Sequence, residues 1–150
     1  MVDRFERFSM MIAEISRCWH KIATDEMEKY ELNGSHAVYL ITLYQCAEGI
    51  TAAKLSELSG KNKSDVSRMI SVMEKKGLVR RKRVHKNLYR AQLTLTEEGR
   101  RAAEQVKERA ELAVECAGQG ITDENRKIFY HVLEQISANL QSLCKEGLPE

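Results

Sequence analysis

The stretch from Thr51 to Val84 constrains the fold of this chain more than any other. Its first part spaces apolar residues as on one face of a helix, with Thr51 as a candidate N-cap and Gly60 as a helix stop. A second helix is expected to begin near Asn62 and to end at Gly77. Its apolar residues recur at the i, i+3, i+4 and i+7 positions of one face: Val66, Met69, Ile70 and Met73. Two short helices, a tight turn and a basic strand predict a helix-turn-helix with a β wing.

The outward face of the second helix combines small hydroxyl side chains with cations. A serine can approach a base edge or a phosphate closely, and an arginine can bond guanine through two hydrogen bonds. Such a face, on a helix whose back is buried, suits the major groove of duplex DNA. The side chains expected to meet DNA, here and on the adjoining turn and strands, are Lys61, Lys63, Ser64, Ser67, Arg68, Ser71, Lys75, Arg81, Arg83, His85, Lys86, Asn87 and Arg90.

Residues 78–84 and 89–95 are expected to form a hairpin whose tip is residues 85–88. Arg81 and Arg83 share one side of the first strand, and the intervening cations share the other. Alternation alone leaves open which of the two sides meets DNA. The tip is expected to lie along the phosphates or to enter the minor groove, where cations follow the negative potential.

The charge distribution favours a nucleic-acid partner for the middle of the chain. The net charge of +2 divides into −3 for residues 1–50, where 8 acidic side chains face 5 basic ones, +8 for residues 51–100 (13 basic, 5 acidic) and −3 for residues 101–150 (6 basic, 9 acidic). A basic module between mildly acidic flanks is typical of contact with a polyanion. No segment approaches the roughly 20 apolar residues of a membrane span, and the N-terminus lacks a signal-peptide pattern, so a cytoplasmic location is expected.

Three short motifs occur together in this stretch, in one order and spacing. They are Val66-Ser67-Arg68 in the second helix, Met73-Glu74 followed by Gly77-Leu78-Val79, and the closing Leu95-Thr96-Glu97-Glu98-Gly99. With them the chain resembles the MarR family of transcriptional regulators over nearly its whole length. One position departs from the family pattern, because the wing tip reads Asn87-Leu88-Tyr89 where the family usually carries Asp-x-Arg.

The resemblance implies a mainly α fold with a small β-hairpin wing, in a single domain. Residues 35–96 would form the winged-helix part, and residues 1–34 and 97–150 would form helices that interlock two subunits. It also implies a homodimeric repressor that binds a palindromic operator on double-stranded DNA. A small lipophilic or aromatic ligand would release it from a cleft beside the DNA module, and by position Trp19, His36 and Tyr39 are candidates to line that cleft.

Long apolar stripes at both ends of the chain agree with a subunit interface. One helix is expected over about residues 3–31, one from His36 (capped by Ser35) to about Ala47, and two more over 97–116 and 122–145. The first and last carry apolar residues in alternating steps of three and four. These residues are Phe5, Phe8, Ile12, Ile15, Trp19 and Ile22 in the first, and Phe129, Val132, Leu133, Ile136, Leu140 and Leu143 in the last.

Other classes of function have less support in the sequence. No nucleophile is paired with a base at a recognisable spacing, and the four cysteines have no metal-ligand spacing, so no enzyme activity, metal or cofactor is expected. The default for the cysteines is a set of reduced thiols packed as small hydrophobes. A redox-responsive repressor that uses Cys18, and a winged-helix protein–protein adaptor that no longer binds DNA, remain alternatives.

Overall fold

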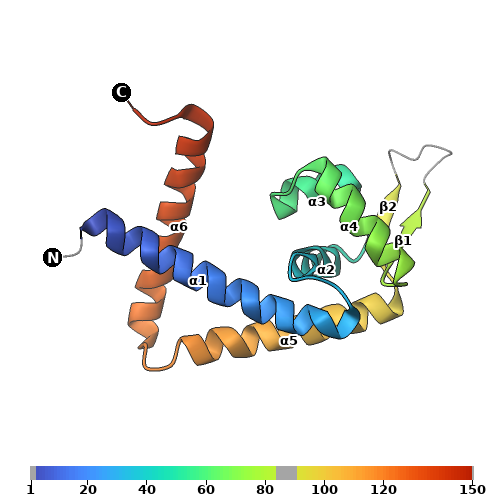
Figure 1. Cartoon of the computed structure of the whole chain (residues 1–150), viewed down its shortest axis with the longest axis horizontal. Coiled ribbons are helices and arrows are strands. Elements are labelled where there is room, and N and C mark those ends of the chain that lie inside the picture. Colours follow the sequence, from blue (N-terminus) through green and yellow to red (C-terminus); the bar gives the residue numbers. More distant parts are fainter. Residues whose placement is uncertain (1–2, 84–90, 150) are drawn as a thin grey trace. The chain divides into compact units, whose positions relative to one another are not determined.

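The structure is a computed structural model that describes residues 3–83 and 91–149. The chain divides into two compact units, Met1–Glu111 and Leu112–Glu150, and each is described by itself. Along the chain the elements are α1 (Arg4–Met27), the 3₁₀ turn η1 (Glu28–Tyr30), α2 (His36–Gln45), α3 (Ala52–Ser59), α4 (Lys63–Lys75), β1 (Val79–Lys82), β2 (Gln92–Leu95), α5 (Glu97–Ala117) and α6 (Asp123–Glu146) (Figure 1).

The predicted fold class is confirmed, since the described chain is mainly helical with one antiparallel hairpin, β1–β2. The helix-turn-helix forms as its end signals indicate. The Thr51 side chain accepts a hydrogen bond from the Lys54 backbone N–H at 3.2 Å, and Asn62 accepts one from the Asp65 N–H at 2.8 Å. Gly60, between the two helices, adopts a left-handed φ of 66°, which a residue without a Cβ does at little cost.

The predicted N-cap of α2 is wrong. Ser35 is already in a helical conformation, with φ −65° and ψ −24°, and its side chain makes no capping hydrogen bond. Asn33 takes the role instead. Its Oδ1 accepts a hydrogen bond from the Ser35 N–H at 3.1 Å, and its carbonyl oxygen accepts one from the His36 N–H at 3.0 Å. An asparagine side chain reaches the N–H two residues further on, so it starts the turn before the serine can cap it.

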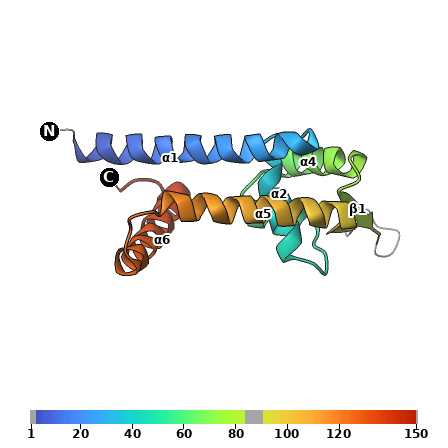
Figure 2. The same ribbon diagram turned by 90° about the horizontal axis from the view of Figure 1, so that it is seen from below.

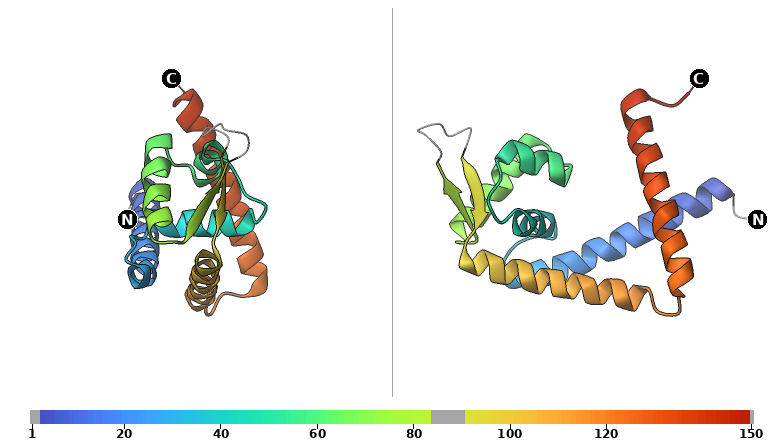
Figure 3. Two further views of the ribbon diagram at one scale, coloured as in Figure 1. Left: turned by 90° about the vertical axis from the view of Figure 1, so that its right-hand side faces the viewer. Right: turned by 180° about the vertical axis from the view of Figure 1, so that it is seen from behind.

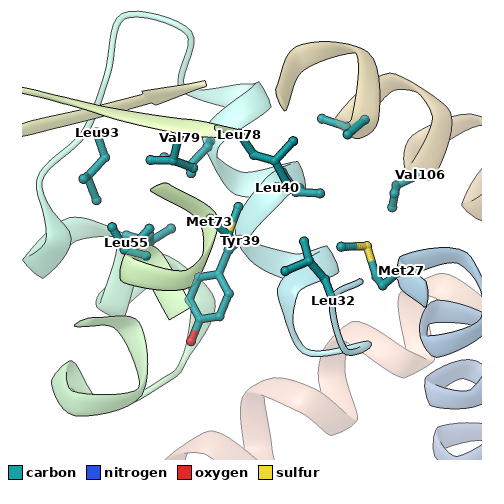
Figure 4. Close-up of a cluster of buried hydrophobic side chains, with 14 of the residues drawn as sticks. Met27, Leu32, Tyr39, Leu40, Leu55, Met73, Leu78, Val79, Leu93 and Val106 are labelled. Carbon is teal, nitrogen blue, oxygen red and sulfur yellow. The ribbon is translucent and has the colours of Figure 1, made fainter. Parts of the chain in front are cut away.

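The core of the first unit surrounds α2, which is apolar almost all round. It is formed by α2, α3, α4, the hairpin, the end of α1 and the first half of α5 (Figure 4). Its fully buried side chains are Met27, Tyr39, Leu40, Leu43, Leu55, Val66, Ile70, Met73 and Leu93. Burial of one large aliphatic side chain contributes about 1.5–3 kcal/mol, so this cluster is what holds α4 against α2 and the hairpin.

The hairpin register decides which strand side chains join this core. Val79 lies opposite Leu95, and Arg81 lies opposite Leu93. Directly opposed residues share a face of the sheet. Val79 and Leu93 are buried, so this face packs inward, whereas Arg80 and Lys82 lie on the other face and are exposed. Figure 3 shows the hairpin next to α4.

Two of the sequence motifs, far apart in the chain, meet where α5 begins. The Thr96 hydroxyl donates a hydrogen bond to the Gly77 carbonyl oxygen at 2.6 Å and accepts one from the Gly99 N–H at 3.0 Å. The Thr96 N–H donates to the Leu78 carbonyl oxygen at 3.0 Å. Thr96 is therefore the predicted N-cap of α5 and also fastens that helix to the turn after α4.

Helix α1 adds to the core only near its C-terminal end, where its buried residues are Glu26 and Met27. The rest extends past α2 (Figure 2). Within this single chain the apolar stripe predicted on α1 is exposed, with Phe5 72% and Ile15 59% accessible. Monomeric proteins rarely expose a contiguous apolar patch of this size, so we expect another surface to cover the stripe.

The second unit consists of the end of α5 and the whole of α6. The predicted N-cap Thr122 accepts a hydrogen bond from the Asn125 N–H at 3.3 Å. No residue of α6 is buried. Most of its large apolar side chains, among them Phe129, Val132 and Leu140, are more than one-third accessible, and Ile136 is half-buried.

Candidate nucleic-acid interface

Helix α4 presents one buried face and one exposed face, as its sequence pattern predicts. Val66, Ile70 and Met73 are buried. The opposite face is exposed and carries Lys63, Ser64, Ser67, Arg68, Ser71 and Lys75. Lys61 is exposed in the turn before the helix. The structure therefore brings the predicted side chains of this helix together on one solvent-facing surface.

A hydrogen-bond network that the sequence reading missed occupies the N-terminal turn of α4. Asp65 forms an ion pair with Arg68 through Oδ1, and its Oδ2 accepts a hydrogen bond from Asn62 Nδ2 at 2.9 Å. The Ser64 hydroxyl donates to Asn62 Oδ1 at 2.8 Å. The available signal was the spacing of three residues between Asp65 and Arg68, which puts the two side chains side by side on a helix.

The cations of the hairpin differ in their surroundings. Arg81, on the inward face of β1, donates from Nε to Glu74 Oε2 of α4 at 2.9 Å. Arg80 and Lys82 point to the opposite face, and Arg83 is exposed just beyond the strand. The expected contacts of His85, Lys86, Asn87 and Arg90 fall outside the described residues.

Helix α4 is also tied to the turn that follows η1. Lys76, directly after α4, forms an ion pair with Glu31, which has a left-handed φ of 54°. The neighbouring ammonium holds the pKa of the Glu31 carboxyl below its usual value. Since Glu31 is mostly exposed, this pair adds little stability, but it connects the turn that follows η1 to the C-terminal end of α4.

A cavity of about 740 Å³ lies on the other side of α2. Residues of α1, α2 and α5 form most of its wall, and Ser59 and Lys61 extend it to the turn before α4. Trp19 lines it, as expected. The mainly apolar wall is completed by a few charged groups, an arrangement typical of small-molecule sites.

His36 and Tyr39 lie elsewhere than predicted. Both are buried in the core, and the α2 residues that face the cavity are instead Ala37, Val38, Ile41, Thr42 and Gln45. Burial lowers the pKa of His36 and raises the pKa of Tyr39. In the described part of the chain, His36 Nε2 and the Tyr39 hydroxyl have no hydrogen-bond partner. Periodicity cannot distinguish the two sides of a helix that is apolar almost all round.

The charged groups of the cavity centre on Glu26. This buried carboxylate accepts hydrogen bonds from Lys29 Nζ at 2.8 Å through both oxygens, and Arg109 Nε lies 3.7 Å from its Oε2. Arg109 is 60% exposed and is thus only loosely held. The cavity lining thus contains two cations, Arg109 and Lys61, and one carboxylate, Glu26. Glu26 is already paired with Lys29.

The cysteines are not packed as predicted, at least within a single chain. Cys18, Cys116 and Cys144 are exposed, and Cys46 is half-buried. The Cys18 Sγ lies 3.5 Å from a Glu14 carboxylate oxygen.

Within residues 3–83 and 91–149, no three His, Cys, Asp or Glu side chains gather as metal ligands do. None of the helices in that part is both long and apolar enough to cross a membrane.

The exposed helix of the helix-turn-helix, with the hairpin beside it, defines a winged helix-turn-helix fold. A protein from Listeria monocytogenes, described as a MarR-family transcriptional regulator and solved with a 26mer DNA, matches it with a TM-score of 0.81. The two chains are 23% identical, and the match covers 100% of this chain and 99% of the other.

Two further solved structures have the same fold. A MarR transcriptional regulator from Methanosarcina mazei matches with a TM-score of 0.80 at 23% identity, over 94% of this chain and 93% of its own. A MarR-family regulator from Silicibacter pomeroyi matches with a TM-score of 0.73 at 20% identity, over 92% of each chain. The resemblance to the MarR family is thereby confirmed in the fold, which is that of these regulators.

Sequence comparison gives a shorter match. The family of the sugar-specific transcriptional regulator TrmB matches residues 27–94, which are less than half of the chain and contain α2, α3, α4, β1 and all of β2 except Leu95. No curated protein sequence matches the chain significantly.

Proposed function

We propose that this protein is a sequence-specific DNA-binding transcriptional regulator that reads the major groove with α4. The observation that carries this proposal is the exposed face of α4. This face carries serines and cations, while the opposite face of the helix is packed into the core. The solved DNA complex of the Listeria protein, which has the same fold, supports it. A face of this composition gives hydrogen bonds to base edges, and the surrounding cations supply the affinity for phosphates.

The test is selection of binding sites from a library of random DNA duplexes, followed by affinity measurements at two salt concentrations. The selected duplex should bind about 10³-fold or more tightly than a scrambled one, and the affinity should fall steeply with salt. Arg68→Ala should lose about 1–3 kcal/mol on the selected duplex if Arg68 bonds a base. Arg17→Ala is a matched control, because Arg17 is a similarly exposed arginine in an i,i+3 ion pair, but on α1.

A protein with no preference for any duplex, at either salt concentration, would contradict the proposal. The winged-helix adaptor would then be the better reading, and a protein partner would have to be sought. Equal losses on all sequences with Arg68→Ala would instead assign Arg68 to the phosphates.

We further propose that the protein acts as a homodimer and represses by covering a two-fold symmetric operator. Each chain has exposed apolar stripes on α1 and α6 that burial against a second copy would remove from water. In a two-fold dimer, the two α4 helices would meet successive major grooves about 34–36 Å apart.

The cavity beside α2 supports a small-molecule effector. Its apolar wall and its loosely held Arg109 and Lys61 suit an amphipathic anion, whose carboxylate would replace part of the contact between Arg109 and Glu26. Because Lys61 adjoins the N-cap of α4, a ligand in the cavity would directly contact the turn that positions the DNA-reading helix. Binding of DNA and of ligand would then be coupled reciprocally, typically by about 1–3 kcal/mol.

A further inference from the structure

We propose that Asp65 is a specificity-determining residue: it orients the Arg68 guanidinium for a base and keeps it from acting as a general phosphate contact. The inference rests on the proposed function, because it assigns a role to one side chain within the same DNA-reading helix. Asp65 itself was absent from the expected DNA contacts, all of which were cationic or neutral.

Both carboxylate oxygens of Asp65 are engaged in the free protein. Oδ1 is paired with Arg68 Nη2, and Oδ2 accepts the 2.9 Å hydrogen bond from Asn62 Nδ2. Asn62 is itself fixed, since its Oδ1 accepts hydrogen bonds from the Asp65 N–H and from the Ser64 hydroxyl, each at 2.8 Å. Asp65 therefore has a defined orientation at the start of α4, and it holds the otherwise flexible Arg68 side chain on one side.

The position of the pair places it at the DNA-facing surface. Arg68 is 77% exposed and Asp65 is 35% exposed, at the edge of the face that carries Ser64, Ser67 and Ser71. A carboxylate at this edge repels phosphate oxygens, which carry the same charge. The pair thus favours base edges over the backbone.

The geometry of arginine explains why orientation matters. A guanidinium reads guanine only when its planar fork meets O6 and N7 together, whereas any orientation serves for a phosphate. An unrestrained Arg68 would contact phosphates on every sequence. Asp65 removes that freedom, so that Arg68 adds to the affinity for DNA mainly where the correct base is present.

A purely structural role for Asp65 predicts a different outcome. An acidic residue in the first turn stabilises a helix through the dipole, and its loss would weaken the fold without changing which bases are preferred. Base preference is therefore the measurement that separates the two roles. Thermal unfolding of each variant, followed by circular dichroism, reports the structural contribution independently.

The experiment compares Asp65→Asn with the wild type in selection from random duplexes and in binding to the selected and scrambled duplexes. We expect binding to scrambled DNA to tighten and the salt slope to steepen by about 0.9, as one further phosphate contact forms. The ratio of specific to non-specific affinity should fall by between about fivefold and a hundredfold. In the selected sequences, preference should be lost at one position of each half-site.

Two controls separate orientation from charge. Glu57→Gln makes the same change in net charge on the neighbouring helix α3, where Glu57 forms an i,i+3 ion pair with Lys54. It should change binding to both duplexes equally and preserve the ratio. In an Arg68→Ala background, Asp65→Asn should leave the base preference unchanged, because Asp65 acts through Arg68.

An unchanged affinity ratio and an unchanged base preference with Asp65→Asn would overturn the proposal. An equal change of base preference with and without Arg68 would overturn it as well. These outcomes differ from a failure of the proposed function, in which the wild type itself would show no sequence preference. A variant that binds no duplex and melts at a lower temperature would assign Asp65 to the fold and also overturn it.

Discussion

Gly99 shows at the scale of one residue how α5 begins in direct contact with the turn after α4. A Cβ built at this position would lie 1.9 Å from the Leu78 carbonyl oxygen and 2.8 Å from its carbon. Both are backbone atoms, which cannot move aside as a flexible side chain can. Thr96 adds hydrogen bonds to the same turn. The glycine at the end of the third motif is thus explained by the close approach of the start of α5 to the backbone of Leu78.

Replacement of Gly99 by alanine should lower the free energy of unfolding by at least about 1–3 kcal/mol, the usual cost of overpacking. Gly118→Ala is the matched control. There the new Cβ would meet only the end of the Arg126 side chain, which can shift. Chemical denaturation of both variants measures the difference. Equal stability of the two would show that the Leu78 turn adapts and that the contact does not fix α5.

At the scale of elements, α2 separates two environments. One of its sides carries Tyr39, Leu40 and Leu43 into the core under α4, and the other carries Val38 and Ile41 into the cavity. A change of shape at the cavity would therefore be transmitted through a packed helix rather than through a loop. The Lys76–Glu31 ion pair provides a second connection, from the end of α4 to the turn that follows η1.

The cavity leads to a prediction about ligand charge. Trp19 lines it and is the single tryptophan of the chain, so its fluorescence reports binding directly. We expect 4-phenylbutyrate to bind more tightly than its neutral amide, and Arg109→Gln to reduce that difference by about tenfold, since Arg109 supplies a charge-assisted hydrogen bond.

Arg101→Gln serves as the control for this prediction, because Arg101 is an exposed arginine of the same helix that does not line the cavity. It should leave the preference for the carboxylate intact. Equal binding of the acid and the amide to the wild type would contradict an anionic effector in this cavity.

For the whole molecule, the exposed stripes on α1 and α6 are the dominant feature. A chain that left them in water would forgo the burial energy of many large side chains, about 25 cal/mol for each Å². We therefore expect a particle of twice the 17.2 kDa chain mass in sedimentation experiments.

Ile15→Asp should dissociate this dimer, because a carboxylate without a partner would be buried twice in a two-fold interface, at several kcal/mol for each ion. Met10→Asp should not, since Met10 is equally exposed but lies on the opposite side of α1 from the stripe. Light scattering would measure the mass of each. A wild-type mass of one chain, or equal dissociation by both variants, would rule out the stripe as the interface.

Local signals in the sequence determined much of this protein. The caps at Thr51, Thr96 and Thr122 and the helix stop at Gly60 each depend on residues within one turn. The periodicity of α4 determined its buried face in the same way, and with it the exposed serines and cations. The resemblance to the MarR fold followed from motifs that lie inside these elements.

Only the tertiary structure decided which distant residues are in contact. It also decided between residues that the local sequence pattern leaves equivalent. Because α2 is apolar on both sides, its sequence gave no reason to place His36 and Tyr39 in the core instead of the cavity. The choice of Asn33 over Ser35 as a cap depended on the turn from α1, and the pairing of Arg81 with Glu74 depended on the approach of β1 to α4. Periodicity describes one element, whereas these contacts depend on how several elements pack.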